Sequence, residues 1–427
     1  MNILIISMVN PFKTSGVVAY NLYKGLKNEG SNTKLLIKPY GKYNSKDIIS
    51  METSTDVFME YWKHKLKRIL NRLGIINKKI TINPDYQIQE FDQTVQYYST
   101  KKLLKKIKFK PDAIIYLFQQ KFLNAKNLYE LNKLTGAKIF WYLMDTAPLT
   151  GACHYSWDCK GYMSGCGKCP ALYSANENDQ SAINFNYKKK YLTKTDIDII
   201  ASSEWLMKKA LASLLFKDKR IHKVLLSIDP NVYTFVPKIQ AKEKLGIPVD
   251  KKVIFFGAIS IILKRKGMKY LIDALQILKE SFNLENDKVL LLIAGNFDTL
   301  HTSLPYEYRH LGLLENNEQL ASAYQAADVF VCPSIEDAGP MMINQSLMCG
   351  TPVVSFQMGA AEDLVLTGET GYSAKLFDSA DLCRGISYVL SLNFKEHEKM
   401  CSSCRSVAIN SFTLNLTAER IMKLLSN

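Results

Sequence analysis

The sequence has no uninterrupted apolar stretch near the ~20 residues of a membrane-spanning helix, although 47% of its residues are hydrophobic. The apolar residues lie in short, separated runs, as in a folded globular protein. A basic leader is missing too, because Asn2–Ser7 reads NILIIS, which is typical of a first β-strand and not of a signal peptide. These features predict a protein of the cytoplasm without a membrane span.

Acidic residues are outnumbered: 40 Asp and Glu stand against 55 Lys and Arg, which gives a net charge of +15. A surplus of this size calls for an anionic partner or surface, such as nucleic acid, phospholipid or a phosphorylated substrate. No nucleic-acid recognition module is present, and aromatic residues do not alternate with basic ones in a stacking pattern. We therefore expect no nucleic-acid partner.

Three motifs of common enzyme classes are missing. No G-x-G-x-x-G follows the first strand, and no G-x-x-x-x-G-K-[ST] phosphate loop occurs anywhere. No G-x-S-x-G sequence marks the nucleophile of a serine hydrolase. The dehydrogenase, P-loop hydrolase and serine hydrolase classes therefore lose their main support.

With 427 residues, the chain is too long for one ordinary core, so two domains of about 150–200 residues are expected. Apolar runs alternate with helical patterns such as Val18–Leu26 and Met268–Leu278. Runs without polar alternation are typical of parallel strands covered on both faces. The predicted strands are Asn2–Ser7, Thr33–Ile37, Ala113–Leu117, Lys138–Tyr142, Asp198–Ala201, Lys252–Phe256, Val289–Ala294, Val329–Cys332 and Pro352–Phe356.

The strand–helix pattern runs twice, with a break around Asp229–Lys242, where Pro230 and Pro237 interrupt regular structure. The expected fold class is α/β, with two Rossmann-like, doubly wound parallel-sheet domains. We expect the first domain at residues 1–234 and the second at 235–405. Ligands of such sheets bind at the carboxyl ends of the strands, so a cleft between the domains is the expected site.

Glycine-containing loops follow several predicted strands. Asn10–Gly16 comes after the first strand, where its backbone amides can face an anion or an acceptor, or its glycine simply permits a turn. In the second half one strand ends in Gly257, and Lys264-Arg-Lys-Gly267 then leads into a helix. Further motifs are Tyr324–Ser334, Ile335–Gln345, Cys349–Val354, Gly359–Leu364 and Gly368–Tyr372.

This series resembles the retaining GT-B glycosyltransferases of family 4, in order and over nearly the whole chain. The resemblance implies a GT-B fold and sugar transfer from a nucleotide-sugar donor with retention of the anomeric configuration, without a catalytic metal. It also implies that a C-terminal helix within residues 406–427 packs back on the first domain.

The resemblance assigns the donor to the second domain. Lys266 matches the lysine that grips the diphosphate, where negative charge gathers in the transition state. The family's usual Arg after Gly257 is Ala258 here, so Lys264 or Arg265 is expected to supply a second cation.

The family's E-x7-E motif, counted back from Cys349, falls on Asp337 and Gln345, with Glu336 and Asn344 as a rival register. Asp337, at the first position of the motif, is expected to contact the sugar, and Gln345, at the second position, is expected to contact the ribose. Backbone amides at the start of the next helix are expected to face the phosphate or sugar. The donor-binding residues implied are Gly257, Lys264, Arg265, Lys266, Glu336, Asp337, Gly339, Met341, Met342 and Gln345.

Two positions depart from the family pattern. Gln345 keeps a carbonyl acceptor but loses the charge, and the family's His-Asp pair is Met144-Asp145, in which the thioether cannot donate a hydrogen bond. Asp145 either orients a substrate or caps a turn. The catalytic residues implied are Asp145, Lys266 and Asp337, and the acceptor side is expected to include Ser15, Gly16 and His154.

Four cysteines crowd into one segment, with Cys153, Cys159, Cys166 and Cys169 spaced as C-x5-C-x6-C-x2-C. Four thiolates at such spacing can close a tetrahedral Zn²⁺ site, and Cys166-Gly-Lys-Cys169-Pro suits one half of it. Some bacterial family 4 members carry a similar insert. We expect a structural zinc in this insert (153–169), with reduced buried thiols as the alternative; His154 either replaces one ligand or faces the cleft.

A basic amphipathic pattern covers Val57–Leu73, which places Phe58, Trp62 and Leu66 on one face and lysines and arginines on the rest. Such a helix is typical of an anionic membrane surface, and the alternative is a core-docked helix with a solvated basic face. Lys101–Lys110 adds weaker support. We therefore expect a peripheral protein on the inner face of the cell membrane.

Together these features predict a glycosyltransferase that moves a sugar from a nucleotide-sugar to a lipid-linked or polysaccharide acceptor at a membrane surface. The alternative is a catalytically silent relative that binds a sugar nucleotide or scaffolds a polysaccharide-assembly complex. Met144 and Gln345 are the residues that keep this alternative open.

Overall fold

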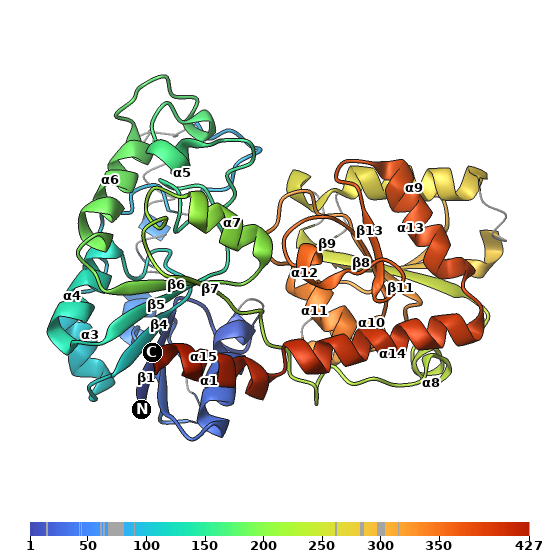
Figure 1. Ribbon diagram of the computed structural model, residues 1–427, viewed down its shortest axis with the longest axis horizontal. Helices are drawn as coiled ribbons and strands as arrows, with labels where there is room; N and C mark the ends of the chain where they lie inside the picture. Colours follow the sequence, from blue (N-terminus) through green and yellow to red (C-terminus); the bar gives the residue numbers. More distant parts are fainter. Residues whose placement is uncertain are drawn as a thin grey trace. The chain divides into compact units, whose positions relative to one another are not determined.

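A computed structural model describes most of the chain (Figure 1). The described residues are 1–13, 16–41, 43, 45–59, 62, 65–66, 81–88, 90–260, 263–281, 286–296, 304–314 and 316–426. They divide into two compact units: Met1–Ala201, Met207–His222 and Ile421–Asn427 form the first, and Ser202–Leu206 and Lys223–Arg420 the second. The domain boundaries expected from the sequence stay predictions.

The first unit is built on a sheet whose described strands have the order β3-β2-β1-β4-β5-β6-β7. The neighbouring strands from β3 to β6 pair in parallel. The strands are β1 (Asn2–Ser7), β2 (Asn32–Ile37), β3 (Ile48–Ser50), β4 (Ala113–Tyr116), β5 (Lys138–Leu143), β6 (Ile197–Ala201) and β7 (Ile221–Lys223). The helices between them are α1 (Gly16–Asn28), α3 (Thr100–Ile107), α4 (Ala125–Thr135), α5 (Gly161–Ser164), α6 (Gln180–Leu192) and α7 (Glu204–Ala212), of which α7 belongs to this unit from Met207 on.

The second unit contains a sheet whose described strands have the order β10-β9-β8-β11-β12-β13, all paired in parallel. They are β8 (Lys252–Ser260), β9 (Val289–Asn296), β10 (Glu307–His310), β11 (Val329–Cys332), β12 (Val353–Phe356) and β13 (Gly371–Ala374). Its helices are α8 (Lys238–Lys244), α9 (Met268–Ser281), α10 (Asn317–Ala326), α11 (Met341–Met348), α12 (Ala361–Leu364), α13 (Ser379–Ser391) and α14 (Phe394–Ser411). The last helix, α15 (Leu414–Leu425), begins in the second unit, and its residues from Ile421 on belong to the first. Within this unit α9 and α13 pack together on one face of the sheet, and α11 and α14 pack together on the other (Figure 1).

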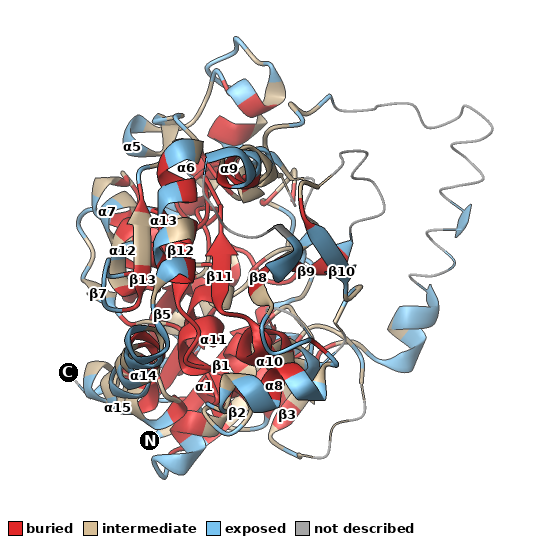
Figure 2. Ribbon diagram, turned by 90° about the vertical axis from the view of Figure 1, so that its right-hand side faces the viewer, coloured by how far each residue is buried: buried red, intermediate tan, exposed pale blue. Residues whose placement is uncertain are grey.

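The central strands form the core of each unit, and in Figure 2 β11 is drawn as buried whereas β10 is drawn as exposed. The apolar residues of β1, Ile3 to Ile6, are fully buried, and so are Val253 to Phe255 of β8. Parallel strands lose water on both faces when helices cover them, which explains why they appear in the sequence as unbroken apolar runs. The predicted strands and the two predicted helices are therefore confirmed, with ends that differ by a few residues.

The strands that the sequence did not predict are short or lie near a sheet edge. β10 is exposed at all four residues, so it carries no apolar run. The expected break around Asp229–Lys242 is too long, because α8 already begins at Lys238. Among the described residues, no helix combines the length and the apolar character that a membrane crossing requires.

Candidate functional site

A tight basic turn follows β8 in the second unit. Residues Lys264–Lys266 form one 3-10 turn that ends at Gly267, whose φ is +67°. A Cβ at Gly267 would lie 1.8 Å from the carbonyl oxygen of Pro333. Because only glycine permits this approach, the basic turn lies directly against the loop that follows β11.

The basic turn forms ion pairs with Asp337. Arg265 Nη1 lies 2.8 Å and Lys266 Nζ 2.6 Å from the same carboxylate oxygen of Asp337. Burial by itself raises the pKa of the Asp337 carboxyl, but the charges of Lys266 and Arg265 outweigh it and lower the pKa to about 2. Asp337 is therefore held as a carboxylate at neutral pH.

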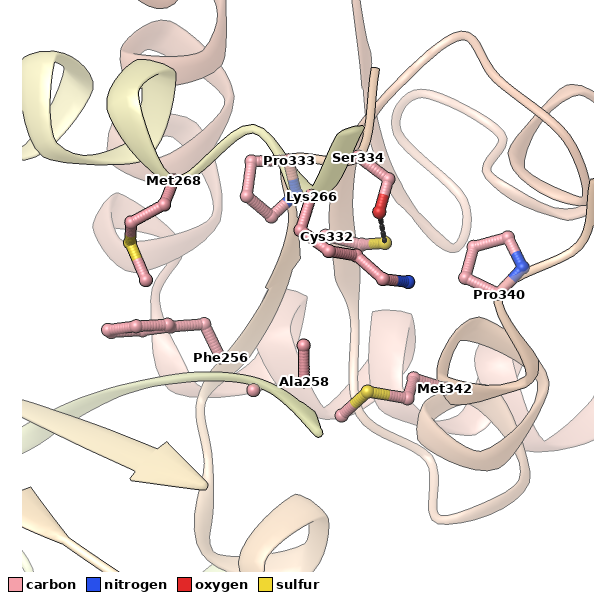
Figure 3. Close-up of a pocket in the computed structure, with 10 residues that line it drawn as sticks. Phe256, Ala258, Lys266, Met268, Cys332, Pro333, Ser334, Pro340 and Met342 are labelled. Carbon is pink, nitrogen blue, oxygen red and sulfur yellow. Dashed lines mark hydrogen bonds between the residues drawn. The ribbon is translucent and has the colours of Figure 1, made fainter. Parts of the chain in front are cut away.

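A cavity that is open to solvent lies beside this ion pair, with about 370 Å³ of empty space that includes part of the solvent at its mouth. Figure 3 shows Met268 and Met342 on opposite sides of it, with the Lys266 side chain between them. The lining residues are Phe256, Gly257, Ala258, Lys266, Met268, Cys332, Pro333, Ser334, Pro340 and Met342. The walls are largely apolar, and within this lining Lys266 alone carries a charge.

The remaining donor-side residues divide by position. Gly257 and Met342 line the cavity, and Met341 begins α11 immediately after Pro340. The Gly339 amide donates to Asp337 Oδ1 at 3.4 Å, so this loop closes on the carboxylate. Arg265 contacts Asp337, and Lys264 in the same turn is exposed.

Glu336 and Gln345 are both buried, yet neither lines the cavity. Gln345 Nε2 donates to the Tyr233 hydroxyl at 2.8 Å, and the Tyr324 hydroxyl donates to Gln345 Oε1 at 3.3 Å. Asn344, from the rival register, donates to the Leu226 carbonyl. The Gln345 amide thus forms hydrogen bonds with two tyrosine hydroxyls inside the second unit and is not among the residues that line the cavity.

On the acceptor side, Gly16 begins α1, and Ser15 lies outside the described residues. A Cβ at Gly16 would lie 1.8 Å from the Asn10 carbonyl oxygen, so the turn between them requires glycine. The Gly16 amide donates to the Lys13 carbonyl at 2.9 Å. Gly16 therefore has a structural role in this turn, whatever else it contacts.

Asp145 lies just beyond β5 and is buried. Its Oδ1 accepts from the Ala147 amide at 2.7 Å, which is a turn contact. Its Oδ2 lies 3.0 Å from His154 Nδ1, and the Thr146 amide donates to the His154 carbonyl. The structure therefore brings Asp145 and His154 together after the end of β5.

Lys188 of α6 is a functional candidate that sequence reasoning missed. It is 2% exposed, and its ammonium donates to the carbonyls of Ala147 and Thr150, both at 2.6 Å. Burial lowers its pKa to about 8, while the nearby side chains of Cys166, Glu90 and Asp145 act to raise it. Its helical spacing after Ala182 and Phe185 is a signal for burial on this face.

The four clustered cysteines line a second cavity, of about 310 Å³, in the first unit. All four are free thiols. A hydrogen bond between the Cys153 and Cys169 sulfurs raises the pKa of Cys153 and lowers that of Cys169. In the described part of the chain, no three His, Cys, Asp or Glu side chains are already arranged as ligands around one point.

Residues 237–406 match the family model described as "Glycosyl transferases group 1". This matched segment contains Lys266, Asp337 and the cavity beside them. Glycogen synthase of Thermotoga petrophila is 26% identical over 197 residues, which is 44% of this chain and 39% of that protein. A phosphatidyl-myo-inositol mannosyltransferase of Mycobacterium leprae is 28% identical over 194 residues, which is 44% of this chain and 48% of that protein. The aligned region thus spans less than half the length of these two relatives.

Solved structures support the fold over the whole chain. Sucrose-phosphate synthase of Thermosynechococcus elongatus has a TM-score of 0.67 at 15% identity, covering 99% of this chain and 98% of that one. HepE of Anabaena, solved in complex with UDP-glucose, has a TM-score of 0.61 at 16% identity, covering 100% and 99%. The expected arrangement of two parallel-sheet α/β domains, as in GT-B proteins, is confirmed.

Proposed function

We propose that this protein is a retaining glycosyltransferase of family 4 that takes its sugar from a nucleotide-sugar donor. The observation that carries the proposal is the pairing of Lys266 and Arg265 with Asp337 beside the cavity of the second unit. This pairing lies within the segment that matches the glycosyl transferases group 1 family. The relatives named as a synthase of glycogen and a mannosyltransferase support the same reaction class.

In this proposal the diphosphate of the donor lies against Lys266. The two cations and one carboxylate of the cluster sum to a net charge of +1, so the cluster attracts an anion while Asp337 stays ionised. When the bond from sugar to diphosphate breaks, negative charge grows on the leaving oxygen, and a cation fixed beforehand stabilises that charge without reorganisation. Asp337 then keeps Lys266 in place.

The acceptor side is proposed to lie in the first unit, around Gly16 and the Asp145–His154 pair. Asp145 Oδ2 lies 3.0 Å from His154 Nδ1 without hydrogen-bond geometry, and in this proposal an acceptor hydroxyl binds beside the two side chains. The acceptor proposed is a lipid-linked or polysaccharide glycan at the inner face of the cell membrane. The basic exposed residues of α3 support an anionic surface, whereas most of Val57–Leu73 lies outside the described residues.

A thermal-shift titration against UDP-, GDP-, dTDP- and CMP-sugars tests the donor proposal. A ligand at 100 times its dissociation constant stabilises the fold by about 2.7 kcal/mol, which moves the melting temperature visibly. We expect a shift with one of the UDP-, GDP- or dTDP-sugars and release of the corresponding nucleoside diphosphate when a glycan acceptor is added; CMP-sugars, which would release CMP, lack the diphosphate that the site is proposed to bind. The Lys266→Ala/Asp337→Ala double variant is expected to lose turnover, and unchanged turnover would refute the site.

A second candidate function is a catalytically silent relative that binds a sugar nucleotide or acts as a scaffold. The observation that favours it is the enclosure of Gln345 between Tyr233 and Tyr324, away from the cavity. A melting-temperature shift with a nucleotide-sugar, but no diphosphate release with any lipid-linked or polysaccharide acceptor, would support this function. No shift with any nucleotide-sugar would leave only the scaffold.

A further inference from the structure

The four clustered cysteines of the first unit converge although they are spread over 17 positions of the sequence. Cys153 and Cys169 are buried, Cys159 and Cys166 are half-buried, and all four line the same cavity of about 310 Å³. A Cβ at Gly161 would lie 3.5 Å from the Cys159 sulfur and 3.7 Å from the Cys166 sulfur, so both sulfurs lie on the same side of α5. Four thiols around one space is a donor set for a soft metal ion.

The backbone around the cavity supplies a hydrogen bond to the Cys166 sulfur. The Gly151 amide donates to Cys166 Sγ at 3.2 Å. In the turn that begins at Pro170, the Leu172 amide donates to the Cys169 carbonyl at 3.1 Å, and the Cys169 amide donates to Asp179 Oδ2 at 2.9 Å. An amide donor such as that of Gly151 stabilises negative charge on sulfur, and metal-thiolate sites rely on such outer contacts.

The chain also bends sharply between the last two cysteines. Gly167 has a φ of +131°, and Lys168 follows in the left-handed region at +47°. A Cβ at Gly167 would lie 2.3 Å from the Glu177 carbonyl oxygen, so glycine is required there. This strained turn directs Cys166 and Cys169 toward the same cavity, which a merely buried pair of thiols would not require.

A buried cation accompanies the thiols. Lys188 is buried, and its ammonium donates to the carbonyls of Ala147 and Thr150 immediately before the cysteine segment. Four thiolates around a divalent ion carry a net charge of −2, which a buried ammonium partly neutralises. A lysine is therefore placed where an anionic metal centre would need one.

We propose that Cys153, Cys159, Cys166 and Cys169 bind one structural Zn²⁺, with Lys188 as the neighbouring counter-charge. On binding, the four thiols release four protons to solvent and no electron is transferred. Each sulfur is one rotatable bond from the backbone, so a change of χ1 can draw it toward the ion without rebuilding the loop. The bound metal then fixes the segment that presents His154 to Asp145.

Elemental analysis of the full chain, purified under reducing conditions, tests the site directly. We expect about one zinc and little iron per chain, as four thiolates with a tetrahedral preference predict. Cys159→Ser and Cys166→Ser are expected to lower the zinc content at least tenfold. Cys383→Ala, which removes a buried thiol of α13 in the other unit, is the matched control and is expected to keep it. Zinc near zero, or iron in its place, in the wild-type chain would overturn the proposal.

Cobalt substitution of the wild-type chain keeps the test decisive if the serine variants do not fold. Added Co²⁺ is expected to give thiolate-to-metal charge-transfer bands and strong tetrahedral d–d bands, with an end point at one equivalent. Hydrogen exchange of the peptides that span residues 145–170 is expected to slow when zinc is restored. No thiolate bands, or a disulfide between any two of the four cysteines in the purified protein, would contradict the proposal.

Discussion

Lys266 and Asp337 form an ion pair at 2.6 Å although 71 positions separate them in the sequence. The pairing follows from topology, because β8 and β11 are neighbours in the sheet and the loops after both strands leave at the same edge. Asp337 is thereby held with its charge while Lys266 still lines the cavity. Lys266 thus lines the cavity, and Asp337 holds the Lys266 side chain in place.

Lys266→Ala is expected to weaken nucleotide-sugar binding. A hydrogen bond to a charged group contributes about 1.5–3 kcal/mol, which corresponds to roughly 10- to 100-fold in the dissociation constant. Isothermal titration with the nucleotide-sugar that shifts the melting temperature measures this loss. Lys264→Ala is the control, because Lys264 belongs to the same turn but is exposed, and it is expected to change the constant less than about threefold. Equal losses in the two variants would show that the turn acts by charge alone.

Asp337 is expected to make stability depend on pH in the acid range. Its pKa is about 2 in the folded protein against a usual 3.8. At pH values above the pKa of the unfolded chain, this difference contributes roughly 2–3 kcal/mol to the free energy of unfolding. That contribution is lost as the pH falls through the folded pKa, and roughly half remains at pH 3. Urea unfolding of wild type and Asp337→Asn from pH 7 to pH 3 is expected to show a difference that shrinks toward acid. A difference that is constant with pH would contradict the ionised state of Asp337.

The regular elements could be predicted because parallel strands covered on both faces are apolar throughout. β1 and β11 have the bounds that their apolar runs indicate. β10 (EYRH) could not, since exposed strand residues leave no hydrophobic pattern. The start of α8 also differs from the expectation, because the helix begins at Lys238, inside the stretch in which Pro230 and Pro237 indicate irregular structure.

The sequence predicts the candidate site only in part. The resemblance placed Lys266 and Asp337 in one site, but their contact depends on strand order, which the sequence pattern alone does not specify. Gln345 was expected at the ribose, and the structure instead encloses its amide between two tyrosine hydroxyls that come from distant positions. Lys188 was missed because its partners are backbone carbonyls, and no side-chain motif records them.

Gly267→Ala is expected to destabilise the protein far more than Gly246→Ala. Both glycines have similar positive φ, +67° and +62°, so an alanine pays a comparable backbone strain of about 1–2 kcal/mol at either position. A Cβ at Gly246 meets nothing within 4 Å, whereas one at Gly267 would lie 1.8 Å from the Pro333 carbonyl oxygen. Urea unfolding should therefore give a small loss for Gly246→Ala and a larger one for Gly267→Ala. Losses of similar size would mean that the turn relaxes away from β11.

Lys188→Met is expected to cost several kcal/mol of unfolding free energy. Methionine retains much of the side-chain volume but donates to neither the Ala147 nor the Thr150 carbonyl, and each buried acceptor left without a partner costs about 1–3 kcal/mol. Lys189→Met is the matched control, because this neighbour in α6 is exposed and its loss should stay within about 0.5 kcal/mol. Urea unfolding at pH 7 measures both. A Lys188→Met variant as stable as the control would mean that water or a rearranged loop satisfies the two carbonyls, and that the ammonium is not needed to hold the segment before the cysteines.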